Sequence, residues 1–213
     1  MYLFRAETKM YMSDGLYDPA WRRGPEERVR PTVLLHACCG PCATSCVERL
    51  INDYSVTLFY YNPNITDVEE YLARREGLLK FIKAFNAEHE PASRVGYIEG
   101  AYEPELFLRA ARDMENEPEG GSRCTMCFTS RLYGTAAMAK RIGADLFSTT
   151  MTVSPHKNHE VIAGAGRKIA EITGTNYLDE DFKKNDGFRR STELSKEYGL
   201  YRQNYCGCRF SMR

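Results

Sequence analysis

The sequence predicts an α/β domain in which helices flank a parallel sheet. Short apolar segments alternate with segments of helical periodicity four or five times along the chain. The first apolar segment, TVLLHA at 32–37, is short and β-branched at its start, which is typical of a buried strand. Turn sequences such as NPN and NEPEGGSRC separate the segments. Together these features favour parallel strands joined by helical crossovers.

The predicted elements follow in chain order. Asp67 is the expected N-cap of a helix whose apolar residues recur at helical spacing. Gly174 is the expected end of a later helix. The strands are expected at 32–37, 55–61, 94–100 and 144–150, and the helices at about ten residues from Ala43, at 67–89, 104–114 and 127–141, within 155–174, and at 187–199.

The domain prediction has two parts. Residues 1–30 are polar and irregular, and we expect them to form an extension outside the core. Residues 31–213 are expected to form a single α/β catalytic domain with a basic C-terminal tail.

The overall charge gives no indication of a nucleic-acid or membrane partner. Lys plus Arg and Asp plus Glu both number 29, so the net charge is zero. No apolar run approaches the roughly 20 residues that span a bilayer. The first residues, MYLFRAETKMYMSDG, lack the apolar region of a signal peptide. We therefore expect a cytoplasmic protein with no membrane partner.

Eight cysteines fall in three groups along the chain. Disulfides are rare in the cytosol, where clustered cysteines more often indicate metal or redox chemistry. The first group, CCGPC, follows the predicted first strand, where α/β folds place their ligand sites. Buried strand cysteines or a thioredoxin-like CGPC motif are the alternatives for this group. Cys46 is expected to fill the core.

The second group, RCTMCF, places Cys124 and Cys127 in a CxxC motif that can hold one metal or one cluster edge. With Cys38 and Cys39 it completes four thiolates, which suit structural zinc or an iron–sulfur cluster. Adjacent cysteines make a poor zinc knuckle, so this pattern favours the cluster.

The third group, YCGC, contains Cys206 and Cys208. A disulfide across one residue is strained and easily reduced, which favours a redox pair. Metal ligation or unpaired thiols in a mobile tail are the alternatives.

Two further segments have polar side chains suited to binding substrate. SPHKNH follows a predicted strand, and His156, Lys157 and His159 could hold a phosphate or a ribose; a helix capped by Ser154 is the alternative.

Residues 183–213 contain eight Lys or Arg against three Asp or Glu, interleaved with aromatic residues. Arginine with aromatic surface is typical of RNA binding, so Arg189 and Arg190 are candidate RNA contacts.

The chain resembles the cobalamin-independent epoxyqueuosine reductase family of the tRNA queuosine pathway. The resemblance covers about residues 31–211 and rests on LLHACCGPC, FYYNPNI, EPEGGSRCTMCF, TTMTVSPHKNH and DFKKNDGFRRSTELSKEYGLYRQNYCGC. It implies a sheet similar to the HUP-like domains of ATP-dependent tRNA-modifying enzymes. CCGPC stands where those enzymes have their phosphate loop, so we expect no ATP.

The resemblance also implies the reaction and its cofactors. The expected reaction is the reduction of epoxyqueuosine to queuosine at the tRNA wobble position, the last step of queuosine biosynthesis. The implied cofactor is a [4Fe-4S] cluster on Cys38, Cys39, Cys124 and Cys127, with Cys206 and Cys208 as the redox-active pair. An additional iron is also implied, for which Asp181 and Asp186 are candidate ligands, and the electron donor is not identified. The rival hypotheses are a zinc-stabilised RNA-binding module and a thiol-disulfide oxidoreductase that uses Cys39 and Cys42.

Overall fold

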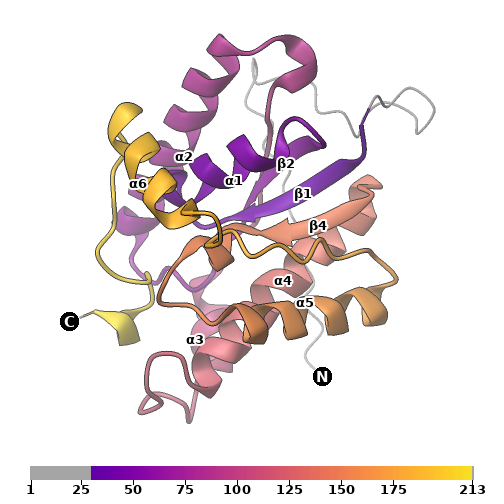
Figure 1. The fold of residues 1–213 in the computed structure, drawn as a ribbon. Coiled ribbons are helices and arrows are strands. Elements are labelled where there is room, and N and C mark those ends of the chain that lie inside the picture. The colour runs from indigo at the N-terminus through magenta and orange to yellow at the C-terminus, as the bar shows by residue number, and fades with distance from the viewer. Residues whose placement is uncertain (1–29, 213) are drawn as a thin grey trace.

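The computed structural model describes residues 30–212, so the expected extension of residues 1–30 lies almost wholly outside the described residues. Its main elements are four strands and six α-helices (Figure 1). The strands are β1 (Thr32–Ala37), β2 (Ser55–Tyr60), β3 (Gly96–Glu99) and β4 (Leu146–Thr149). The helices are α1 (Gly40–Leu50), α2 (Val68–Glu88), α3 (Pro104–Ala110), α4 (Ser122–Ile142), α5 (His159–Thr173) and α6 (Gly187–Glu197), with short 3-10 turns η3 (Pro91–Ser93), η4 (Thr150–Val153) and η5 (Arg209–Ser211).

The sheet confirms the predicted fold class. All strand pairs are parallel, and the spatial order is β3-β2-β1-β4. The chain builds the sheet from β1 outward to β3 and then returns to the other side of β1 with β4. This reversal creates a switch point between β1 and β4, where the following loops diverge and leave room for a ligand.

The two faces of the sheet carry separate cores. Alternate residues of β1 point to opposite faces, so Val33 and Leu35 pack toward α1 and α2, whereas Leu34 packs toward α4 and α5. Figure 1 shows α1, α2 and α6 on one side of the sheet and α4 and α5 on the other. Because both faces are covered, every residue of β1 is buried, which explains its largely apolar sequence.

Two helices begin earlier than predicted, and both differences affect cysteines. Helix α1 begins at Gly40 rather than Ala43, because Pro41 fits the first turn, where no backbone donor is needed. Helix α4 begins at Ser122 rather than Cys127, and the carboxylate of Glu117 accepts a hydrogen bond from the Ser122 amide. Cys42 and Cys124 therefore lie in the first turns of their helices, and Cys127 lies in the second turn of α4.

The predicted helix ends are otherwise close to those observed. Asp67 caps α2 by accepting a hydrogen bond from the Glu70 amide at 2.8 Å. Gly174 ends α5 in the left-handed conformation, with φ of 68°. The alternative cap at Ser154 is wrong, since Asn158 caps α5 through the Glu160 amide. Among residues 30–212, no helix combines the length and apolar character needed to cross a bilayer.

Candidate active site

A buried group of three thiols lies just beyond the carboxyl end of β1. The sulfur atoms of Cys38, Cys39 and Cys42 all lie within 4.8 Å of one another, and Cys38 Sγ is 3.8 Å from Cys39 Sγ. Neighbouring side chains of an extended strand point apart, but the turn into α1 directs both toward one place. Among the described residues, this is the only group of three or more potential ligands so arranged. We call it the cysteine triad.

The tight backbone of this turn depends on Gly40. A Cβ atom there would lie 2.6 Å from the carbonyl oxygen of Gly77 on α2, so only glycine permits this approach of α1 to α2. The approach fixes the first turn of α1 beneath the strand end. It thereby places Cys42 beside Cys38 and Cys39.

The protonation of the triad is uneven. Hydrogen bonds from Cys39 and Cys42 hold the pKa of Cys38 well below its ordinary value, although burial opposes this effect. Burial raises the pKa of Cys39 to about 12, and the proton shared with Cys38 raises that of Cys42. Of the three thiols, Cys38 therefore loses its proton most readily.

This arrangement does not suit a thioredoxin-like nucleophile. Such a cysteine is accessible and has a lowered pKa, whereas Cys39 has no exposed surface and its pKa is raised. The disulfide-exchange hypothesis for Cys39 and Cys42 is accordingly not favoured.

A second group of thiols lies next to the triad. Cys124 and Cys127 on α4 line one small void of about 10 Å³ together with Cys206 and Cys208 of the tail. Burial raises the pKa of Cys124, and it raises that of Cys127 to about 12. All eight cysteines are free thiols, so the structure does not support the expected disulfide between Cys206 and Cys208.

The tail that carries Cys206 is fastened to the start of α2. Arg74 donates hydrogen bonds to the carbonyl oxygens of Tyr205 and Cys206, both at 3.0 Å. Gly207 has φ of 113°, and a Cβ there would lie 3.0 Å from the Arg74 guanidinium. The glycine of YCGC is therefore needed for both its backbone angle and its close contact.

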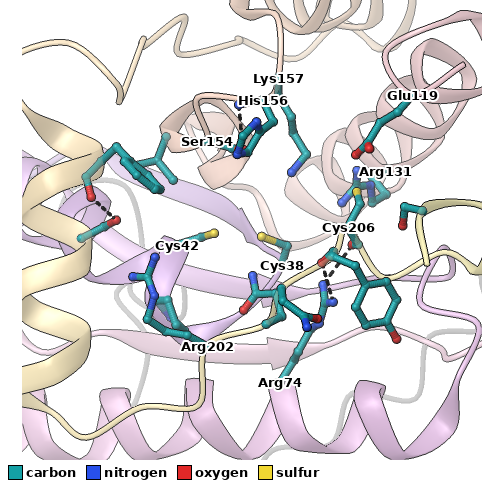
Figure 2. A pocket seen from close by; sticks show the side chains of 18 of the residues that line it. Cys38, Cys42, Arg74, Glu119, Arg131, Ser154, His156, Lys157, Arg202 and Cys206 are labelled. Carbon is teal, nitrogen blue, oxygen red and sulfur yellow. Dashed lines mark hydrogen bonds between the residues drawn. The ribbon is translucent and has the colours of Figure 1, made fainter. Parts of the chain in front are cut away.

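A cavity of about 650 Å³ joins the two thiol groups (Figure 2). Cys38 and Cys42 line it from one side, and Cys206 lines both this cavity and the small void. Four cationic side chains and one acidic side chain also line it: Arg74, Arg131, Lys157, Arg202 and Glu119. The volume is in the range of small-ligand sites, and the excess of cations suits an anionic group.

The structure only partly brings the predicted substrate-binding residues into the cavity. His156 and Lys157 line the cavity, and Figure 2 shows Lys157 pointing into it. His159 does not line the cavity but shares a shallow neighbouring pocket with His156 and Lys157, and its Nε2 atom lies 3.1 Å from Asp179. Arg189 is exposed over 71% of its side chain, whereas Arg190 forms an ion pair with Glu48 that joins α6 to α1.

Other singled-out residues lie outside the cavity lining. Cys46 is fully buried in the core, as predicted, and donates to the Cys42 carbonyl. His36 is satisfied by Thr149 and the Tyr61 carbonyl, and burial lowers its pKa to about 3, so it is neutral. Asp186 precedes α6 and pairs with Arg189. Asp181 lines a shallow neighbouring pocket, so neither aspartate lines either thiol cavity.

The cavity lining includes residues that were not predicted from the sequence, among them Arg131, Arg74 and Gln203. Arg131 lies one helical turn beyond Cys127, and the spacing of 124, 127 and 131 places all three on one face of α4. Arg74 gave no sequence signal, because its role depends on a partner far along the chain. Gln203 donates to Cys39 Sγ at 3.0 Å and lines the cavity.

Known proteins are similar to this chain over most of its length. The family model described as epoxyqueuosine reductase QueH matches residues 33–213. A relative of that name from Streptococcus pyogenes is 42% identical over 188 residues, covering 88% of this chain and 73% of the relative. One from Staphylococcus epidermidis is 42% identical, covering 90% and 79%. One from Thermotoga maritima is 36% identical, covering 85% and 90%. The chain belongs to the epoxyqueuosine reductase QueH family.

Proposed function

We propose that this protein reduces epoxyqueuosine to queuosine in tRNA, with residues 31–213 as one catalytic domain. The reaction consumes two electrons and two protons. Both C–O bonds of the epoxide break, a carbon–carbon double bond forms, and the oxygen leaves as water. A separate electron donor provides the electrons.

The cavity that joins the cysteine triad to Cys206 carries this proposal. It brings three kinds of group together: soft thiol ligands, cations and an aromatic side chain, Phe188. Its volume of about 650 Å³ suits a single modified nucleoside. A base that must reach such a cavity has to leave the stack of the anticodon loop, as in other enzymes that modify bases.

The thiols fit a [4Fe-4S] cluster in number and chemical type. We propose Cys38, Cys39, Cys124 and Cys127 as its ligands, consistent with the preference of iron–sulfur clusters for thiolates. The closeness of Cys42 to Cys38 and Cys39 makes it a further soft ligand, better placed for an additional iron than Asp181 or Asp186. When bound, the cluster would supply single electrons, and an additional iron would polarise the epoxide oxygen.

The protein's own groups supply protons and orientation. The ammonium group of Lys157 faces the cavity and can donate a proton to the leaving oxygen. Cys206 and Cys208, oxidised together to a disulfide, would release two electrons and two protons, which equals the requirement of one turnover. Arg202 lies 6.0 Å from the centre of the Phe188 ring, and the two offer a surface on which a base can stack.

The tRNA itself extends beyond the cavity. We propose that the basic helix α6 contacts the phosphates of the anticodon arm, with Arg189 as the exposed contact. Arg190 is a less suitable contact because its side chain is less exposed, at 44%, and its ion pair with Glu48 joins α6 to α1.

Anaerobic turnover with tRNA that carries epoxyqueuosine tests the proposal. Protein reconstituted with iron and sulfide and supplied with dithionite should convert the nucleoside to queuosine, measured by mass spectrometry of the digested tRNA. The visible spectrum separates the rivals, since a cluster colours the protein and zinc does not. A colourless protein that binds tRNA without converting it would support the zinc-stabilised RNA-binding module instead.

A further inference from the structure

Arg131 is a buried cation whose charge is not matched by a carboxylate. It is 1% exposed, the bulkiest of the fully buried side chains, and it lines the cavity between the two thiol groups. Its Nε and Nη2 atoms have no hydrogen-bond partner. Among residues 30–212, no carboxylate forms an ion pair with it.

Such an arrangement is costly unless something anionic is present. Moving an unpaired charge out of water costs several kcal/mol even after the protein relaxes. Arg74, the other buried arginine that lines the cavity, is instead paired with Glu70 at 2.6 Å and donates to two carbonyl oxygens. Glu119 also lines the cavity, but it is exposed and therefore screened by solvent. We therefore expect an anionic partner for Arg131 inside the cavity.

The cysteines near Arg131 indicate which anionic group this partner is. Arg131 lines the cavity together with Cys38 and Cys206, and Cys127 lies one helical turn before it on α4. These cysteines come from α4, the tail and the end of β1, and Figure 2 shows Arg131 beside Cys206. A metal group held by four thiolates is anionic, because the ligands contribute four negative charges to a core of charge two.

We infer that Arg131 is the built-in counter-charge of the thiolate-bound metal group, and that it holds this group's reduction potential above the value the thiolates alone would give. The inference rests on the proposed metal centre. Reduction adds a negative charge to the group, and a fixed neighbouring cation favours the reduced state. Hydrogen bonds and charges around iron–sulfur groups act on potentials in this way.

The test compares wild type with Arg131→Met and Arg131→Lys after anaerobic reconstitution with iron and sulfide. The methionine removes the charge at similar volume, whereas the lysine keeps it. Arg131→Met should bind iron about 10- to 100-fold more weakly, and its midpoint potential should be more negative. The midpoint potential of Arg131→Lys should lie between those of wild type and Arg131→Met. Arg49→Met is the control, because Arg49 is paired with Glu180 outside the cavity, and its potential should equal that of wild type.

Unchanged iron content and potential in Arg131→Met would overturn the inference, including the case in which only tRNA binding is lost. If Arg131→Met holds no metal at all, thermal unfolding of the metal-free proteins decides. A metal-free variant at least as stable as metal-free wild type supports the inference, because an unmatched buried charge has been removed. A variant less stable without metal shows a structural role and overturns it. If wild type does not take up iron and sulfide, the proposed metal centre is refuted. The inference about Arg131 is then refuted as well, because it rests on that centre.

Discussion

The Arg74 guanidinium donates a hydrogen bond to the carbonyl oxygen of Cys206 at 3.0 Å, across 132 positions of the sequence. Arg74 is buried on α2, and its own charge is matched by Glu70. The contact fixes the backbone of the tail cysteine at the boundary between the main cavity and the small void. Arg74 therefore determines where a thiol from the end of the chain meets the cysteine triad.

Replacing Arg74 with methionine should release the tail. Losing one member of a buried ion pair destabilises a protein by about 3–5 kcal/mol, so thermal unfolding should occur at lower temperature. Limited trypsin cleavage after Arg202 and Arg209 should become faster. The neighbouring Arg75→Met is the control, since Arg75 pairs with Glu99 and has no contact with the tail. Equal cleavage rates in wild type and Arg74→Met would contradict the anchoring role.

Serine at Cys124 or Cys127 should leave the reconstituted protein pale and poor in iron, because an alcohol is a much weaker ligand for iron than a thiolate. Iron and sulfide analysis with the visible spectrum measures this. Cys46→Ala is the matched control: the residue is fully buried but outside the thiol cavities, so it should lower stability and leave iron content normal. Full cluster content in Cys124→Ser would remove this residue from the ligand set.

Serine at Cys206 or Cys208 should separate electron storage from metal binding. If the two thiols cycle with a disulfide, each variant should keep the cluster spectrum and lose multiple turnover. If they hold a separate iron, each should lose about one iron per chain, as expected for a site built from soft thiolates. Both quantities can be measured on the same samples. Wild-type turnover in both variants would exclude both roles.

Lys157→Met should lower the turnover number by about 10²- to 10⁴-fold, the usual contribution of a positioned proton donor. Lys157→Arg keeps the positive charge but cannot donate a proton at neutral pH. It should therefore retain tRNA affinity and stay slow. Single-turnover rates and binding constants measured on the same preparations distinguish the two effects. An arginine variant as fast as wild type would assign Lys157 a purely electrostatic role.

Arg189→Ala should weaken tRNA binding and reduce the slope of log affinity against log salt, by about one for a lost phosphate contact. Arg190→Ala should mainly lower thermal stability, because it breaks the ion pair with Glu48. Glu48→Gln breaks the same pair without removing a cation and serves as its control. An unchanged salt slope in Arg189→Ala would place the tRNA elsewhere on the surface.

The fold class, most of the elements and the position of the site could be predicted from the sequence. Buried parallel strands are rich in apolar residues, so β1 was evident from TVLLHA, and CCGPC directly after it marked the strand end where ligands bind. Asp67 and Gly174 were found because caps depend on local chemistry. The start at Gly40 was missed although Pro41 in the first turn is a local signal for it, whereas the start at Ser122 depends on a carboxylate from the preceding loop.

The sequence did not reveal which side chains come into contact, because this depends on the packing of the whole domain. The tertiary structure placed Cys42 within reach of Cys38 and Cys39, separated His159 from the cavity lining, and bound Arg190 to Glu48. Arginine is usually found at the surface, and no local sequence feature distinguishes a buried arginine such as Arg131 or Arg74 from a solvated one. Their roles arise from chain segments that lie far apart in sequence and are brought together by the strand order β3-β2-β1-β4. Periodicity encodes which face of an element is buried, whereas the identity of the neighbours on that face depends on the packing of the whole sheet.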